Sequence, residues 1–184
     1  MRPQPNRKAD PNDEVIELAA SCRFDPDKWS RVAFDWGHGE LSDYDGPREW
    51  QTDINQVIRD HLANPETRYE PLQIAVASGH GIGKSAQMGM LSNWAMSCFD
   101  RAKVVITANT ETQLRTKTSP EIGQWFRRSL TGHWFDVNSQ SIKTRDREAT
   151  EQWRMDFVTW SEHNTEAFAG LHNKGKIIML LFDE

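Results

Sequence analysis

The sequence predicts an α/β fold in which a parallel sheet is flanked by helices. Strand-like runs of apolar or β-branched residues alternate along the chain with stretches whose apolar residues recur every three or four positions, the period of a helix. A turn rich in glycine joins one strand-like run to the helix after it. Because chains that alternate strands with helices build parallel sheets, these observations predict the α/β class.

Residues 1–24 are predicted to be a mobile tail, and residues 25–184 a single domain. Residues 1–14 are polar, contain proline and lack an apolar period, so they bury too little surface to fold. Aromatic residues interrupted by turn formers follow between positions 25 and 46, and we expect a loop that covers the domain there. A length of 184 residues suits one core of ordinary size.

The first regular elements surround the glycine-rich turn. From Trp50 onward, the residues at positions 54, 57, 58, 61 and 62 fall on one face, which predicts a helix that ends at Asn64-Pro65. Residues 72–77 predict a short strand. Residues 84–99 carry apolar side chains at three- and four-residue spacing, which predicts a helix with one buried stripe.

Further strands and a kinked helix are predicted in the second half of the chain. Residues 103–107 form a β-branched strand, and Thr110 with Gln113 signals the start of the next helix. Pro120 must kink or restart that helix, because proline lacks the backbone N–H that the helix needs. Residues 153–157 alternate between apolar and polar side chains, so we expect an antiparallel strand paired with residues 134–142.

The composition of the chain argues against several classes of protein. Hydrophobic residues make up 37% and charged residues 27%, and no apolar run approaches the roughly 20 residues of a membrane-crossing helix. The first residues lead into no apolar stretch, so we expect no secretory signal and a cytoplasmic location. Cys22 and Cys98 lack partners at ligand spacing, which favours buried thiols over a disulfide or a zinc site. A net charge of −5 argues against a protein that coats nucleic acid by charge alone.

The strongest chemical signal is the glycine-rich turn between the strand at residues 72–77 and the following helix, where a phosphate-binding loop is expected. Glycines let backbone N–H groups converge on a polyanion, and the helix N-terminus adds its positive dipole end. Lys84 would meet the β- and γ-phosphates of ATP, and Ser85 would bind Mg²⁺. Ser78 departs from the usual G-x-x-x-x-G-K-[ST] pattern, and the alternative is a glycine turn with an incidental Lys-Ser pair. The predicted nucleotide-binding residues of the turn are Ser78, Gly79, His80, Gly81, Ile82, Gly83, Lys84 and Ser85.

A second signal is the acidic pair that follows the continuously apolar residues 177–182. Such a run predicts a parallel strand buried on both faces, and open α/β sheets bind ligands at the carboxyl ends of their strands. Asp183 would hold Mg²⁺ through water, and Glu184 would orient or deprotonate the attacking water, which makes Glu184 and Lys84 the predicted catalytic residues. An Asp-Glu pair after a strand is common, so its weight comes from its position about 100 residues beyond the loop.

A third candidate is the segment GPREWQ, which precedes the loop. The Gln51 side chain can offer an amide donor and acceptor to the edge of adenine, while Trp50 or Arg48 could stack on its ring. The alternative is a helix start with an aromatic anchor.

Five segments together resemble the ATPase domain of tailed-phage terminase large subunits, a P-loop NTPase of the ASCE, RecA-like type. The segments are GPREWQTDI, SGHGIGKSA, VVITANTETQLRTK, AFAGLH and IIMLLFDE, and the resemblance spans roughly residues 25–184. It implies that Gln51 corresponds to the adenine-contacting glutamine. It likewise implies that Lys84 and Ser85 are the Walker A pair, and Asp183 and Glu184 the Walker B pair.

The resemblance also implies the biological role. It implies a motor that hydrolyses ATP with Mg²⁺ to drive double-stranded DNA into a capsid, encoded by a phage or prophage and located in the host cytoplasm. The implied partners are double-stranded DNA, a small terminase subunit, a portal protein and further copies of the chain in a homo-oligomeric ring. Arginines in the family stabilise transition-state charge, although surface ion pairs explain arginines equally well. The candidates here are Arg115, Arg127, Arg128 and Arg154.

Two further segments match the family. Residues 107–115 resemble its segment after the second strand, whose mechanical role the sequence leaves open. Residues 168–172 resemble a turn before the acidic pair, where a packed or capping role is favoured for His172.

Family members also carry a nuclease domain and ATPase strands that these 184 residues lack. In the family's fold, the strand after the acidic pair lies between the strands that carry the two motifs. Its absence would leave a gap at the sheet centre with unpaired backbone groups. We therefore expect a truncated chain, a fragment or one piece of a split gene, that hydrolyses ATP poorly and is marginally folded.

Two other functions remain open, a helicase-like DNA translocase and a non-catalytic nucleotide-binding or assembly module. Helicase motifs further along a chain would favour the first, and nucleotide binding without turnover the second. A GTPase is disfavoured, because residues 173–176, Asn-Lys-Gly-Lys, lack the aspartate of an N-K-x-D guanine reader.

Overall fold

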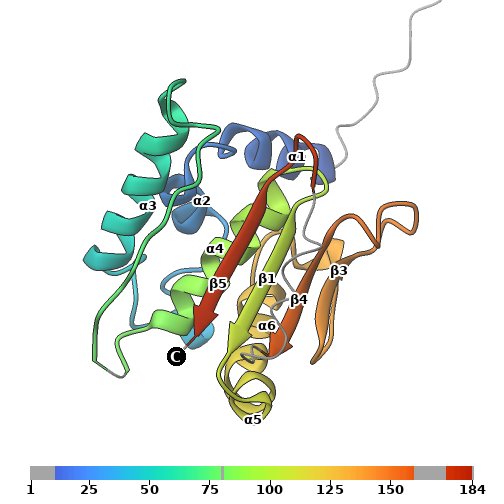
Figure 1. The fold of residues 1–184 in the computed structure, drawn as a ribbon. Coiled ribbons are helices and arrows are strands. Elements are labelled where there is room, and N and C mark those ends of the chain that lie inside the picture. The colour runs from blue at the N-terminus through green and yellow to red at the C-terminus, as the bar shows by residue number, and fades with distance from the viewer. Residues whose placement is uncertain (1–10, 80, 160–172, 184) are drawn as a thin grey trace, which may run out of the picture.

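The computed structural model describes residues 11–79, 81–159 and 173–183. They form an α/β fold with a five-stranded sheet in the order β2-β3-β4-β1-β5. Helices α4 (Lys84–Cys98) and α6 (Ser119–Arg127) lie behind the sheet in Figure 1. The predicted α/β class is therefore confirmed.

The sheet is mixed, whereas the sequence predicted a parallel one. Strands β1 (Lys103–Ala108), β4 (Arg154–Thr159) and β5 (Ile178–Asp183) are parallel, with β1 in the middle. Strands β2 (Phe135–Val137) and β3 (Ser141–Thr144) pair in antiparallel fashion, and β3 pairs antiparallel with β4. These connections are too short for the crossover of a dozen or more residues that a parallel pair needs. The predicted antiparallel partner of β4 is confirmed for residues 141 and 142, whereas residues 135–137 pair with β3 instead.

Helix α4 is buried on all sides, not along one stripe as predicted. Every residue from Gln87 to Cys98 is buried. The helix runs through the middle of the molecule, with β1, β4 and β5 on one side and α1, α2 and α6 around it. A helix enclosed in this way needs no polar face, which explains why its small and polar residues are buried as well.

The N-terminal region is more ordered than the predicted tail. Pro11–Ser21 form helix α1, in which Ala19 is 3% exposed, and the following Cys22 is fully buried. The Trp94 indole N–H donates a 3.0 Å hydrogen bond to the Cys22 carbonyl, which fastens this region to α4. The prediction of a mobile tail is thus wrong for residues 11–24, because apolar side chains that look isolated in sequence find partners on α4.

The predicted covering loop contains regular structure as well. Helix α2 (Pro26–Val32) is capped by the Asp25 side chain, and its Trp29 is fully buried. A short 3₁₀ turn, η1 (Gly39–Leu41), follows. This region is therefore part of the core and does not merely cover it.

Helix α3 (Glu49–Ala63) closely matches its predicted bounds, and Asn64 is its C-cap. Ile54, Ile58 and Leu62 pack against the core as expected. Val57 is 51% exposed, so the buried face is narrower than predicted. None of the helices that the structure describes has both the length and the apolar content to cross a membrane.

The helix predicted after β1 is divided into three parts. Thr110 caps α5 (Glu111–Gln113) by accepting a 3.1 Å bond from the Gln113 N–H. A π-helical segment, η2 (Leu114–Thr118), follows, and α6 then carries Pro120 in its first turn. The predicted cap and the restart at Pro120 are both confirmed. A 3₁₀ turn, η3 (Gly132–Trp134), leads from α6 into β2.

Residues 72–77 do not form the predicted strand. Within the described residues, positions 71–79 make no backbone hydrogen bond to a neighbouring strand. In Figure 1 this extended segment runs alongside β5 without joining the sheet.

Strand β5 is present and parallel to β1 as predicted, but it is not buried on both faces. Ile178, Leu180 and Phe182 are 37%, 42% and 68% exposed. Among the described residues β5 pairs with β1 alone, which leaves its other edge open toward residues 71–77. The run of apolar residues was read correctly as a strand, but burial depends on neighbours that the run itself does not specify.

Candidate functional site

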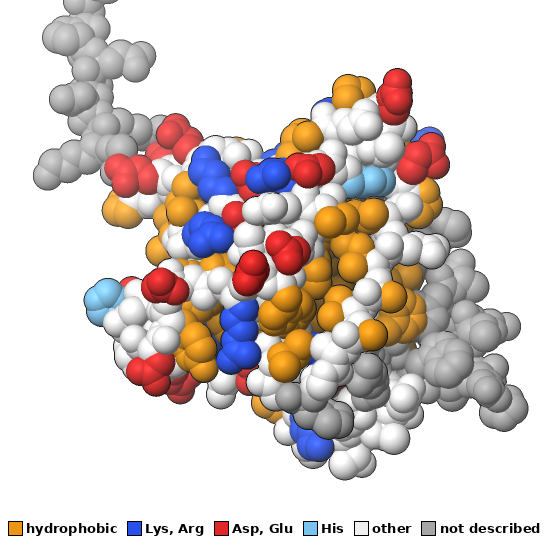
Figure 2. Space-filling model, turned by 90° about the vertical axis from the view of Figure 1, so that its left-hand side faces the viewer, with side chains coloured by type: hydrophobic (Ala, Val, Ile, Leu, Met, Phe, Trp, Pro, Cys, Tyr) orange, Lys and Arg blue, Asp and Glu red, His pale blue; other side chains and the backbone are white. Residues whose placement is uncertain are grey.

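A cavity of about 640 Å³ lies between α3, the N-terminal part of α4, residues 70–76 and β5. Its walls are mostly apolar, and Figure 2 shows hydrophobic side chains exposed among charged ones on the α3 side of the molecule. Lys84 and Asp183 both line it. The cavity thus brings together residues from the two motifs that the sequence singled out, 99 positions apart.

The glycine-rich turn enters α4 through residues with positive φ. Gly81 has a φ of 75° and Gly83, the residue before the helix, a φ of 91°. Only glycine adopts such angles without steric cost, which accounts for its recurrence here. The turn places Lys84 and Ser85 in the first turn of a helix of 15 residues, where backbone N–H groups have no partner within the helix.

The Lys84 side chain folds back over the turn. Its ammonium group donates to the Ser78 carbonyl at 3.3 Å, and Lys84 and Ser85 are both half-buried. The Ser78 hydroxyl is itself buried and has no hydrogen-bond partner in the described part of the chain. An ammonium group at the start of a helix is suited to an anionic ligand, because the ammonium and the helix N–H groups can both donate to it.

Gln51 is used to hold the turn in place. Its amide donates to the Gly83 carbonyl at 3.0 Å, and its oxygen accepts from the Arg48 N–H at 2.9 Å. The residue is 4% exposed. The Arg48 guanidinium adds a 3.3 Å bond to the Ile82 carbonyl. These hydrogen bonds hold the start of α3 against the glycine-rich turn. A role of Gln51 in contacting adenine stays a prediction.

Trp50 lines the same cavity as Lys84. Its indole N–H is buried and has no hydrogen-bond partner among the described residues. A buried tryptophan N–H usually finds a partner, so an aromatic ring with an unused donor fits a ligand that offers both a flat face and an acceptor.

Asp183, the last residue of β5, is opposite Ala108 at the end of β1. Its carboxylate accepts a hydrogen bond from the hydroxyl of Thr118, the last residue of the π-helical segment η2. No group of three or more histidine, cysteine or acidic residues within the described ranges could hold a metal ion alone. A single carboxylate suits Mg²⁺, which typically binds one or two protein oxygens together with phosphates and water.

Several predicted residues are outside the described ranges. They are His80 in the turn, Glu184 of the acidic pair and the segment 168–172 with His172. Gly79, Ile82 and Ser85 belong to the turn and to the first turn of α4, as the sequence placed them.

Three of the four candidate arginines are held by carboxylates. Arg115 contacts Glu111 at 2.7 Å, and Arg128 pairs with Glu40 and stacks over Trp125 at 4.8 Å. The fourth, Arg127, is exposed on α6.

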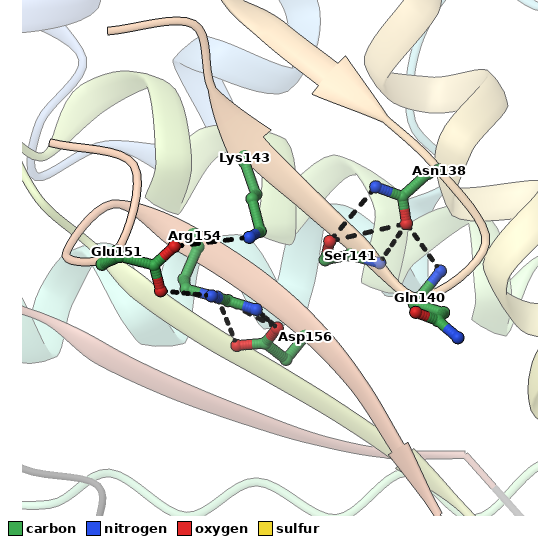
Figure 3. A network of polar contacts seen from close by, with 7 residues as sticks. All are labelled: Asn138, Gln140, Ser141, Lys143, Glu151, Arg154 and Asp156. Carbon is green, nitrogen blue, oxygen red and sulfur yellow. Dashed lines mark hydrogen bonds and ion pairs between the residues drawn. The ribbon is translucent and has the colours of Figure 1, made fainter. Parts of the chain in front are cut away.

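Arg154 has the most extensive contacts of the four, on β4 (Figure 3). Its guanidinium donates to both carboxylate oxygens of Asp156, at 3.0 and 2.9 Å from Nε, and to Glu151 at 2.8 Å. The hydrogen bonds that Arg154 donates to Asp156 raise the pKa of Arg154, and the charges of Lys143 and Arg154 lower the pKa of Glu151. Held in this way, Arg154 supports the sheet, as the ion-pair alternative anticipated.

Sequence reasoning missed Thr118 as part of the site. The nearby sequence contains a proline at position 120 and three threonines within residues 112–118. Neither feature indicates a hydrogen-bond partner 65 positions away. The contact arises from the π-helical turn, which no residue pattern predicted.

Comparison with known proteins adds no family assignment: no family profile, no curated protein and no solved structure matches this chain.

Proposed function

We propose that this chain binds ATP with Mg²⁺ and is the ATPase part of a motor that packages double-stranded DNA. The observation that carries the proposal is the cavity shared by Lys84, at the start of α4, and Asp183, at the end of β5. Positive charge at a helix N-terminus and a carboxylate at the carboxyl end of a parallel strand are what binding of a metal–triphosphate requires.

Each residue has a distinct part in this proposal. The Lys84 ammonium and the N–H groups at the start of α4 would hold the phosphates, and the Ser78 hydroxyl could donate to them. Ser85 and Asp183 would provide oxygen ligands for Mg²⁺, which would neutralise phosphate charge when bound. Trp50 would contact the base, and Glu184 would orient the attacking water.

The motor function and its partners derive from the resemblance to terminase large subunits. DNA translocation, a small terminase subunit, a portal protein and a ring of copies are therefore parts of the same proposal. The alternatives are a helicase-like translocase and a module that binds nucleotide without hydrolysing it.

The proposal is tested by titrating the chain with ATP in the presence and absence of Mg²⁺, using calorimetry. We expect Mg²⁺-dependent binding that Lys84→Ala reduces at least ten-fold, because the phosphates lose their cationic partner. Lys28→Ala, a lysine on α2 that bonds Ser21 at 3.1 Å, is the matched control and should bind as the unaltered chain does.

Absence of any Mg²⁺-dependent ATP binding by the folded chain would refute the nucleotide site. Binding without turnover, even with the family's remaining domains supplied, would favour the non-catalytic module. Hydrolysis that double-stranded DNA stimulates would favour a motor, and unwinding of a duplex would favour the helicase-like translocase.

A further inference from the structure

We infer that Thr118 is a positioning residue that fixes the carboxylate of Asp183 for metal binding. The inference rests on the proposed function and adds a residue to it. Thr118 is fully buried, and its hydroxyl donates to Asp183 Oδ2. Since that hydroxyl has one proton, the bond restrains one carboxylate oxygen and leaves the other available to a ligand.

The local backbone directs the Thr118 hydroxyl toward Asp183. A threonine inside a helix usually donates to the carbonyl one turn earlier, as Thr116 does to Thr112 at 2.7 Å. In η2 the carbonyl of Leu114 instead accepts from the Ser119 N–H, five residues on, which is the bond of a π-helix. The wider turn rotates the residues after it, and Thr118 thereby points away from its own helix toward β5.

Pro120 helps to keep this turn open. Proline has no N–H to donate to the carbonyl at position 116, so regular α-helical bonding through this point is impossible. The cap at Thr110 and the proline at 120 thus bracket the π-helical segment. The segment that leaves β1 therefore has a function in the site, because it provides the donor for Asp183.

Groups that orient a metal ligand commonly change metal affinity by ten- to hundred-fold when they are removed. Thr118→Val keeps the shape of the side chain and removes the donor. We expect it to raise the Mg²⁺ concentration at half-maximal ATP binding about ten-fold. Thr118→Ser keeps the hydroxyl and should stay within about two-fold of the unaltered chain. Thr116→Val, in the same segment but exposed, is the matched control and should change nothing.

A second measurement does not depend on nucleotide. In the ligand-free chain, the ¹³C shift of the Asp183 carboxyl carbon should change in Thr118→Val and not in Thr116→Val. The Thr118 hydroxyl proton of the unaltered chain should exchange slowly enough to be seen by NMR. Urea unfolding of each variant separates a loss of folding from a loss of metal binding.

The outcomes distinguish the two proposals. An unchanged ¹³C shift of the Asp183 carboxyl carbon in Thr118→Val overturns the inference, whether or not the chain binds nucleotide. If that variant does not fold, rapid exchange of the Thr118 hydroxyl proton in the unaltered chain overturns it instead. An altered shift with unchanged Mg²⁺ dependence shows a purely structural contact and also overturns it. If the unaltered chain binds no ATP, the proposed function fails and Thr118 loses its metal-positioning role even though the contact persists.

Discussion

Gly89 on α4 and Trp125 on α6 touch directly, because the glycine has no side chain to keep the two helices apart. A methyl group at Gly89 would be 2.7, 2.8 and 2.9 Å from three side-chain atoms of Trp125. These distances are shorter than van der Waals contact. Trp125 in turn packs edge-on against Phe34, with ring centroids 5.0 Å apart. The glycine therefore determines how closely α6 approaches the central helix.

Gly89→Ala should destabilise the chain even though alanine is the better helix former. The gain in helix propensity is about 1 kcal/mol, while overpacking a core costs about 1–3 kcal/mol. We expect a net loss of up to about 2 kcal/mol in the free energy of unfolding, measured by urea denaturation. Combining it with Trp125→Leu should cost less than the sum of the two single changes, and strict additivity would contradict the steric explanation.

Asn93→Ala should be more damaging, because this buried side chain connects three parts of the fold. The Asn93 amide accepts from the Trp29 indole at 2.9 Å and donates to the Ser129 hydroxyl at 3.0 Å. Its removal leaves buried donors and acceptors unpaired, at roughly 1–3 kcal/mol for each. We expect a loss of about 2–4 kcal/mol by urea denaturation. Asn109→Ala, at an exposed position, should stay within about 0.5 kcal/mol.

Stability should fall at alkaline pH through the thiol of Cys98. Burial raises the pKa of Cys98 well above its usual range, and it also raises the pKa of Cys22. Because the pKa of each thiol is higher in the folded chain, the free energy of unfolding has its full value below the unfolded pKa of about 8.5. Above that pH the free energy of unfolding falls, by up to about 1.4 kcal/mol per pH unit for each thiol.

The contribution of Cys98 is isolated by comparing Cys98→Ala with the unaltered chain at pH 7 and pH 9.5. The unaltered chain should lose more of its unfolding free energy between the two pH values than the variant does. Equal losses would mean that other groups, such as lysines and tyrosines, account for the alkaline effect. Both cysteines are free and buried, as the sequence predicted, so the unaltered chain should also resist alkylation at pH 8.

The elements that sequence predicted well are those with a local cause. The β-branched residues of β1, the Thr110 cap and the break at Pro120 depend on neighbours within a few positions. The surroundings of an element have no such local signal. Tertiary packing decides the burial of α4 on all sides, the docking of α1 and the exposed face of β5. That packing depends on the whole chain.

The candidate site divides in the same way. The place of Asp183 in the cavity follows from a general rule, because open α/β sheets bind ligands at the carboxyl ends of parallel strands such as β5. The rule does not cover Lys84, since the segment before its turn is not a strand. The engagement of Gln51 with the loop backbone and the bond from Thr118 were not predictable. The first needs the position of α3 beside the loop, and the second needs a backbone conformation that residue preferences do not encode.

The open edge of β5 has a practical consequence for handling the protein. Within the described residues β5 pairs with β1 alone, and a strand edge that no second strand covers, next to side chains as exposed as Phe182 and Leu180, is a template on which other extended chains can add. We therefore expect this strand to limit the concentration at which preparations remain monodisperse. A lysine in place of Phe182 would extend that range without touching the packing of α4.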